Sequence, residues 1–266
     1  MSKFNRRKLL EVAFATVGCA LASPSGLLVP GKNMTASDDD PATTDVAERL
    51  AILRKRRRHL GPPSGELLQA FERIPRPVLV YDLHQVEENY LAFVEARKDV
   101  QVHYAIKACP KLRIVQRVAK LGGGFDVAST AELDLALNTG VDPKRCIYSN
   151  TVKTPNDIRY AFSKGVVAFL ADSEPEVRKL AKNAPGSRLY VRLEVHNKDA
   201  MHPLSGKFGT TPDNVKKLLR LGKTLGLVPY GTHFHVGTQC FKAAAWEKPA
   251  REAAAIFHEL KKEGIP

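Results

Sequence analysis

From about residue 77 onward, short runs of β-branched and apolar residues alternate with longer stretches whose apolar residues recur at helical spacing. This alternation is typical of an α/β fold with a parallel sheet. The strands that the pattern predicts are 78–82, 102–107, 124–127, 146–149, 166–171, 189–195 and 228–236. Most of them are short and apolar enough to be buried on both faces.

Capping residues predict where the intervening helices begin and end. Residues 173–176 are Ser-Glu-Pro-Glu, which predicts a capping box between Ser173 and Glu176 around a first-turn proline. A threonine followed by proline occurs at 154–155 and again at 211–212. Three glycines follow helical stretches, where a left-handed residue commonly closes a helix: Gly122, Gly226 and Gly264.

The spacing of the strands favours a barrel. Successive strands are about 20–40 residues apart, and no Gly-x-Gly-x-x-Gly follows the first of them. A (β/α) barrel is therefore expected in preference to a dinucleotide-binding Rossmann half. Because barrel enzymes place their chemistry at the carboxyl ends of the strands, candidate residues are sought there.

The first 74 residues have a different composition. Arg6, Arg7 and Lys8 precede an apolar stretch at 12–22 that ends in Ala-Leu-Ala, a pattern that resembles a twin-arginine export signal over residues 1–22. This pattern predicts a periplasmic protein, with a cytoplasmic one as the alternative. The stretch is too short to span a bilayer, so we expect no stable membrane insertion. Residues 23–74 are expected to form a linker and a basic helical segment, and 75–266 a partial barrel domain.

Composition and charge limit the classes of partner. The chain has 266 residues, 44% of them hydrophobic, and a formal net charge of +13. The densest basic run, residues 54–59, has no interleaved aromatic residues, so a solvated segment is favoured over a nucleic-acid surface. The four cysteines form no CxxC pair and suggest neither a disulfide framework nor a zinc ribbon.

Two strand ends carry candidate chemistry. Lys107 ends the strand 102–107, and it is either a snorkelling lysine or a Schiff-base lysine made nucleophilic by burial. His233 and His235 share a face near the end of strand 228–236. They could be core histidines, a metal-binding pair, or a ring stacked on a cofactor whose phosphate Gly237 and Thr238 would bind; the Gly-Thr continuation favours the last interpretation.

Asp126 follows a run of three glycines and brings a carboxylate to the end of another strand. By itself this is weak evidence, because a loop aspartate that bonds backbone amides would have the same pattern.

Taken together, seven motifs closely resemble the alanine-racemase-like, pyridoxal-phosphate-dependent decarboxylases, and most of all the bacterial ornithine and lysine/ornithine decarboxylases. The motifs are YAIKA at 104–108, GFDVAS at 124–129, Glu132, YSNTVK at 148–153, VRL at 191–193, PLSGKFG at 203–209 and HFHVGTQ at 233–239. The resemblance extends from about residue 75 to residue 266. It implies a pyridoxal-phosphate-binding (β/α)8 TIM-type barrel, a second β-rich domain and a homodimer with shared active sites.

The resemblance also implies roles for individual residues. Lys107 matches the lysine that bonds covalently to the cofactor, and His235 the imidazole that stacks on its ring. Asp126 and Glu132 match acidic residues around that lysine, and Arg192 matches a polar anchor on the ring side. Gly237 and Thr238 match positions that bind the phosphate of the cofactor. No metal is implied.

In this family, the segment after residue 266 would bring a glycine-rich phosphate loop, the glutamate that holds the pyridine nitrogen, and the C-terminal β domain. We therefore expect an incomplete barrel of about six strands in a truncated chain. The activity implied by the resemblance is decarboxylation of a basic amino acid, with L-ornithine to putrescine first and lysine, arginine or diaminopimelate as alternatives. A non-catalytic cofactor-binding or regulatory homologue is the competing hypothesis.

Overall fold

The computed structural model describes residues 79–97, 99–204 and 206–265. Six strands form one parallel sheet in the order β1-β2-β3-β4-β5-β7. Their bounds are β1 His103–Ala105, β2 Gly124–Val127, β3 Cys146–Tyr148, β4 Ala168–Ala171, β5 Arg188–Leu193 and β7 Val228–Phe234. This confirms the predicted α/β fold and its six barrel strands.

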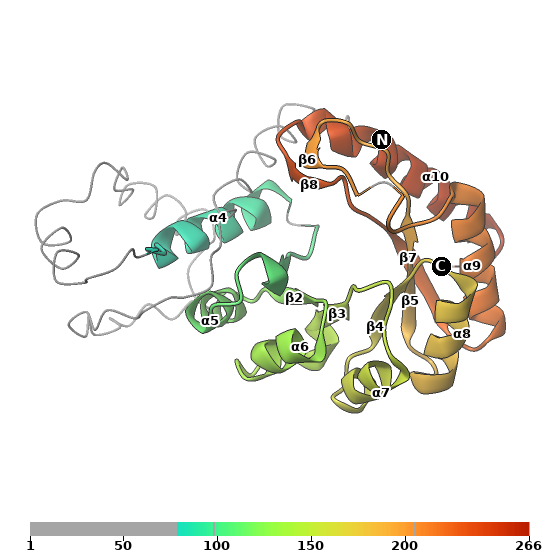
Figure 1. Ribbon diagram of the computed structural model, residues 1–266, viewed down its shortest axis with the longest axis horizontal. Coiled ribbons are helices and arrows are strands. Elements are labelled where there is room, and N and C mark those ends of the chain that lie inside the picture. Colours follow the sequence, from blue (N-terminus) through green and yellow to red (C-terminus); the bar gives the residue numbers. More distant parts are fainter. Residues whose placement is uncertain (1–78, 98, 205, 266) are drawn as a thin grey trace, which may run out of the picture.

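Each strand is followed along the chain by a helix, and Figure 1 shows these helices around the outside of the curved sheet. The helices are α5 Leu112–Lys120, α6 Thr130–Leu137, α7 Pro155–Ser163, α8 Glu174–Asn183, α9 Pro212–Thr224 and α10 Glu247–Lys262. A further helix, α4 (Leu83–Ala96), packs against α5. In the described part of the chain, β1 and β7 are the two edges of the sheet, so the barrel is open.

The core lies between the sheet and its helices. Phe125 on β2 and Phe169 on β4 are fully buried, and so are Leu189 on β5 and the helix residues Ile158 and Leu180. Removing such side chains from water stabilises the fold by about 1.5–3 kcal/mol each. All four positions of β4 are buried, as expected for a parallel strand covered on both faces.

The predicted helix boundaries are mostly confirmed. Thr154 begins α7 with a complete capping box to Asp157, and Thr211 caps α9 through the Asn214 N–H. The three helix-ending glycines have positive φ values, the conformation that favours glycine: Gly122, Gly226 and Gly264. The capping box expected at Ser173 is wrong, because its side chain makes no cap bond; Glu176 instead pairs with Lys153.

Several strand predictions need correction. The strand predicted at 166–171 begins at Ala168, and those predicted at 189–195 and 228–236 end at Leu193 and Phe234, so His235 lies beyond the end of β7. Residues 79–82, within the expected strand 78–82, are not a strand; Leu79 and Val80 are exposed, and Asp82 caps α4 through the His84 N–H. The strand expected at 102–107 ends at Ala105, and Lys107 belongs to the 3-10 turn η2 (Ile106–Ala108).

Two further strands form a small second sheet, separate from the main one. Strand β6 (Ala200–His202) pairs antiparallel with β8 (Thr238–Cys240), and the pattern of the sequence predicted neither. The 3-10 turns η3 (Pro143–Arg145) and η4 (Ala243–Trp246) complete the elements. None of the described helices is long and apolar enough to cross a bilayer. The predicted signal at 1–22 and the segment at 23–74 lie outside the described residues.

Candidate functional site

Charged and polar side chains converge at the carboxyl edge of the sheet, because all six strands are parallel and end on that side. Lys107 follows β1, Asp126 lies on β2, Arg192 on β5, and His235 follows β7. Burial first, and then the charges of Arg192 and Lys107, lower the pKa of His235. Burial lowers the pKa of Arg192, against the charges of Asp172 and Asp126. The structure therefore brings together four of the residues that the sequence predicted.

Lys107 is an exposed amine, contrary to the expectation of a lysine desolvated at a strand end. The chain turns at η2 because Ile106 is fully buried and its carbonyl accepts from the Cys109 N–H at 3.0 Å. The Tyr104 hydroxyl adds a bond to the Cys109 carbonyl at 3.2 Å. The turn is thus anchored beneath Lys107 while the amine itself stays accessible.

Arg192 is a buried cation whose guanidinium makes no hydrogen bond or ion pair with any of the described residues. Burial lowers its pKa, while the charges of Asp172 and Asp126 raise it. The guanidinium carbon lies 5.3 Å from the centre of the Phe208 ring. A buried arginine with unused donors is costly, so this geometry suits an anionic ligand.

Asp172, which sequence reasoning missed, follows β4 and accepts a bond from the Gly209 N–H at 3.0 Å. Gly209 has φ +96°, and a Cβ there would lie 2.8 Å from the backbone of Glu194, so the turn approaches β5 too closely for a side chain. This contact holds the loop that carries Phe208 over Arg192. Gly209 is the last residue of the motif PLSGKFG, so the sequence marked this turn. Nothing in the sequence indicated that Asp172 binds it.

His235 has a defined tautomer. Its Nδ1 accepts from the Gly237 N–H at 2.9 Å. Burial first, and then the charges of Arg192 and Lys107, lower its pKa to about 4. The ring is therefore neutral at physiological pH and carries its proton on Nε2.

Position 237 favours glycine for two reasons. Its backbone is in the left-handed region, with φ +98°, and a Cβ there would lie only 2.5 Å from the Cβ of Ala200. The predicted role of this N–H as a phosphate donor does not fit the arrangement, because the N–H already bonds His235. Thr238 lies in β8 opposite His202, within the small sheet. Among the described residues, no group of three or more His, Cys, Asp or Glu could hold a metal, which leaves His233 and His235 without a third ligand there.

Glu132 makes a local contact. Its Oε2 accepts from the Ala128 N–H at 2.8 Å, and the Ser129 hydroxyl caps the same helix through the Glu132 N–H. The carboxylate thereby closes the turn after β2 that follows Asp126. In the described chain it bonds this backbone amide instead of a side chain of the cluster.

A buried ion pair braces the loop after β3. The Lys153 side chain is fully buried, and its Nζ lies 2.9 Å from Glu176 Oε1 on α8. The same Nζ donates to the carbonyls of Asn150 at 2.7 Å and Leu170 at 2.6 Å. Burial lowers the pKa of Lys153, and the charge of Glu176 opposes that effect. Lys153 is the last residue of the motif YSNTVK, but the sequence alone indicated no role for it.

Comparison with known proteins identifies the family. Residues 83–266 match the family described as pyridoxal-dependent decarboxylase, pyridoxal binding domain. The chain belongs to this family. Its relatives include a lysine/ornithine decarboxylase of Selenomonas ruminantium, 37% identical over 194 residues, which are 73% of this chain and 49% of the relative. An ornithine decarboxylase of Neurospora crassa is 35% identical over 70% of this chain and 38% of its own length.

Solved structures of decarboxylases in this family agree with the fold. A lysine decarboxylase from Selenomonas ruminantium superposes with a TM-score of 0.71 and 35% identity, covering 77% of this chain and 54% of that one. A lysine/ornithine decarboxylase from Vibrio vulnificus, complexed with putrescine, gives 0.68 and 26%, covering 76% and 55%. The chain thus spans about half the length of the relatives it matches.

Pyridoxal phosphate is the group that the family implies, and the residues at the carboxyl edge fit it. Lys107 offers an accessible amine, His235 a neutral planar ring, and Arg192 a buried cation with unused donors. Lys107 and Arg192 supply two positive charges for a phosphate-bearing ligand, and the carboxylates of Asp172 and Asp126 lie near Arg192. The fit is poorest at Gly237, whose N–H is already bonded.

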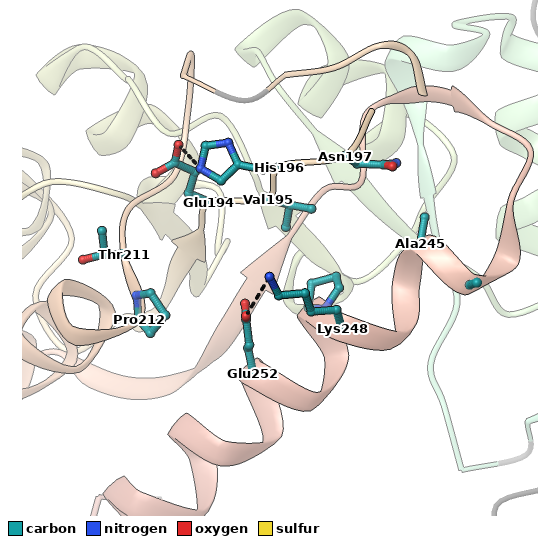
Figure 2. A pocket seen from close by; sticks show the side chains of 11 residues that line it. Glu194, Val195, His196, Asn197, Thr211, Pro212, Ala245, Lys248 and Glu252 are labelled. Carbon is teal, nitrogen blue, oxygen red and sulfur yellow. Dashed lines mark ion pairs between the residues drawn. The ribbon is translucent and has the colours of Figure 1, made fainter. Parts of the chain in front are cut away.

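A cavity of about 300 Å³ lies close to this edge, beyond the end of β5 and beside the start of α10 (Figure 2). Its polar groups pair with each other: His196 Nε2 lies 2.9 Å from Glu194 Oε1, and Lys248 Nζ lies 3.9 Å from Glu252 Oε1. A second cavity, of about 370 Å³, lies near the amino ends of β1 and β2 and includes Arg145 in its lining. Neither cavity is lined by Lys107 or Arg192.

Proposed function

We propose that the chain binds pyridoxal phosphate at the carboxyl edge of its sheet and serves the decarboxylation of a basic amino acid. The observation that carries this proposal is the buried, unpaired guanidinium of Arg192 at the same edge as the exposed amine of Lys107. The names of relatives support it, since they include lysine/ornithine and ornithine decarboxylases. A structural neighbour is described as a complex with pyridoxal phosphate and cadaverine.

When bound, pyridoxal phosphate supplies an aldehyde and an electron-withdrawing ring that makes loss of CO2 from an amino acid feasible. Lys107 contributes the amine that would bond to the aldehyde and later accept or donate a proton at Nζ. His235 presents a neutral ring whose orientation the Gly237 N–H fixes. Arg192 and Asp126 supply opposite charges on neighbouring sides of the same site.

For the substrate we propose L-ornithine, with putrescine as product and polyamine biosynthesis as the pathway. Lysine, arginine and diaminopimelate are the competing substrates. Relatives named for lysine and ornithine, and a neighbour described as an arginine decarboxylase bound to agmatine, support a basic side chain without choosing among these. We also propose that the protein works as a homodimer, the arrangement that the family resemblance implies.

The test of cofactor binding is covalent trapping. The full chain is incubated with pyridoxal phosphate, reduced with borohydride and digested, and mass spectrometry then locates the modified lysine. We expect modification at Lys107, its loss in Lys107→Ala, and no loss in Lys120→Ala, since Lys120 is also an exposed lysine and lies on α5. Modification spread equally over surface lysines would refute a specific site.

A second candidate function has one specific observation in its favour. Antizyme inhibitor 2 of Xenopus laevis is 33% identical over 70% of this chain and 41% of its own length. Its name describes a regulatory protein, so the chain could belong to a cofactor-binding or regulatory homologue without catalysis. Release of CO2 from carboxyl-labelled ornithine, lysine, arginine and diaminopimelate distinguishes the two, measured on this chain and on one extended by the segment that follows in the family. Turnover of any substrate by either chain supports the enzyme, and trapping at Lys107 without turnover by either supports the homologue.

A further inference from the structure

His233 lies beside Arg192 in the interior of the site. The Cα atoms of the two residues are partners in the register between β7 and β5, so the side chains lie next to each other on the same face of the sheet. The continuation of the register past Ala171 and Val191 brings Asp172 to the other side of Arg192. Asp172, which follows β4, thus stands in one row with Arg192 on β5 and His233 on β7.

Two members of this row have unused hydrogen-bonding capacity that is complementary. Nδ1 of His233 is buried and has no hydrogen-bond partner in the described chain. The Arg192 guanidinium, an obligate donor, has no acceptor among the described residues either. Buried polar atoms in native proteins are almost always paired, so the buried, unpaired Nδ1 of His233 beside a cation with unused donors requires an explanation.

We propose that His233 is a positioning residue for Arg192: a bond from one guanidinium N–H to its Nδ1, which this structure does not contain, would orient the remaining donors toward the bound anionic cofactor. This inference rests on the proposed function, because it assigns the free donors of Arg192 to pyridoxal phosphate. The bond requires a neutral imidazole with its proton on Nε2, since a protonated ring has no acceptor nitrogen.

The surroundings enforce that neutral form. Burial first, and then the charges of Arg192, His235 and Lys107, lower the pKa of His233 to about 3. His233 is therefore neutral throughout the physiological range, and so is His235. The two imidazoles have separate tasks: Nδ1 of His235 is already used by Gly237, which leaves His233 as the one with a free acceptor.

Two variants separate the acceptor from the ring. His233→Asn keeps a polar acceptor near the position of Nδ1, whereas His233→Phe keeps the planar ring and removes the acceptor. The matched control is His258→Phe, at an exposed histidine on α10. For pyridoxal phosphate we expect His233→Phe to bind about tenfold more weakly, the effect of losing one net hydrogen bond, and His233→Asn to stay within about threefold of the unsubstituted chain.

A second measurement does not depend on the cofactor. In the full chain labelled with 15N, we expect His233 to show the neutral Nε2–H tautomer, and the Arg192 Nε–H signal to exchange faster with solvent in His233→Phe than in His233→Asn. An unchanged Arg192 exchange rate together with unchanged affinity in His233→Phe would overturn the inference. If the unsubstituted chain did not bind pyridoxal phosphate, the proposed function would be wrong. The Arg192 exchange rates would still show whether His233 pairs with Arg192.

Discussion

The buried pair Lys153–Glu176 offers the sharpest test of how the carboxyl edge is stabilised. Lys153→Met removes a fully buried ammonium that pairs with Glu176 at 2.9 Å and donates to two backbone carbonyls at 2.7 and 2.6 Å. Breaking a buried pair from one side typically costs about 3–5 kcal/mol. Here the loss is moderated, because Lys179 still pairs with Glu176 at 2.6 Å. We therefore expect a decrease of about 3 kcal/mol in the free energy of unfolding.

Glu176→Gln should cost less, about 2 kcal/mol, because Lys153 retains both carbonyl acceptors and can release its proton. The pH dependence gives an independent check. Burial lowers the pKa of Lys153 below its ordinary value of 10.5, so between the two values the unfolded chain binds more protons. Stability contributed by this group therefore rises with pH across that window. Removing the negative charge of Glu176 lowers the pKa of Lys153 further and should widen the window downward.

The assay is urea unfolding followed by circular dichroism, for both single variants, the double variant and Lys182→Met, an exposed lysine on the same helix α8. A double-mutant cycle isolates the pair energy. We expect a coupling of at least about 1 kcal/mol and a change below about 0.5 kcal/mol for Lys182→Met. If Lys153→Met were no more destabilising than Lys182→Met, the claim that this pair braces the loop after β3 would be wrong.

The remaining predictions concern the candidate site and the predicted export signal at residues 1–22. Gly237→Ala should weaken pyridoxal phosphate binding at least tenfold, since a Cβ would lie 2.5 Å from another and φ is +98°; equilibrium dialysis measures this, and unchanged binding would contradict the account of His235. Lys107→Ala should abolish covalent trapping yet leave the unfolding midpoint unchanged, because the side chain is exposed. Because the pKa of His235 is lowered from 6.5 to about 4, its contribution to stability should fall as pH decreases through that window, and His235→Gln should flatten the decrease in urea titrations. Export is proposed from the first 22 residues: replacing Arg6 and Arg7 with lysine should retain the protein in the cytoplasm, and unchanged fractionation would reject it.

Local sequence signals predicted much of the fold. The alternating pattern located all six strands of the parallel sheet, and threonine caps located α7 and α9, because burial on both faces and helix capping are determined by near neighbours in sequence. The strand expected at 78–82 failed for a reason outside its own pattern. Its residues have strand propensity, but the sheet offers them no partner in this structure, and Asp82 caps a helix instead.

The site was predicted less completely, because its geometry depends on residues that are distant in sequence. Lys107 and His235 follow β1 and β7, and the period of the sequence placed both at the ends of the predicted strands. Asp172 and the partnership of Lys153 with Glu176 depend on register between strands and on helix packing, and no local pattern encodes these. Glu176 is an example. The residues around it predicted a capping box with Ser173, but its carboxylate pairs with the buried Lys153, which is distant in sequence.

The spatial order of the six strands is the same as their order along the chain. Each strand pairs with the strand of this sheet that precedes it along the chain, and most of these pairings close segments of only about 20 residues, for example His103 with Gly124 and Phe125 with Cys146. A chain emerging from the ribosome can therefore add one strand and its helix at a time to a growing edge. Assembly needs no later segment to enter between strands already paired, so the polypeptide can acquire its structure vectorially, during synthesis, at a low entropic cost per step.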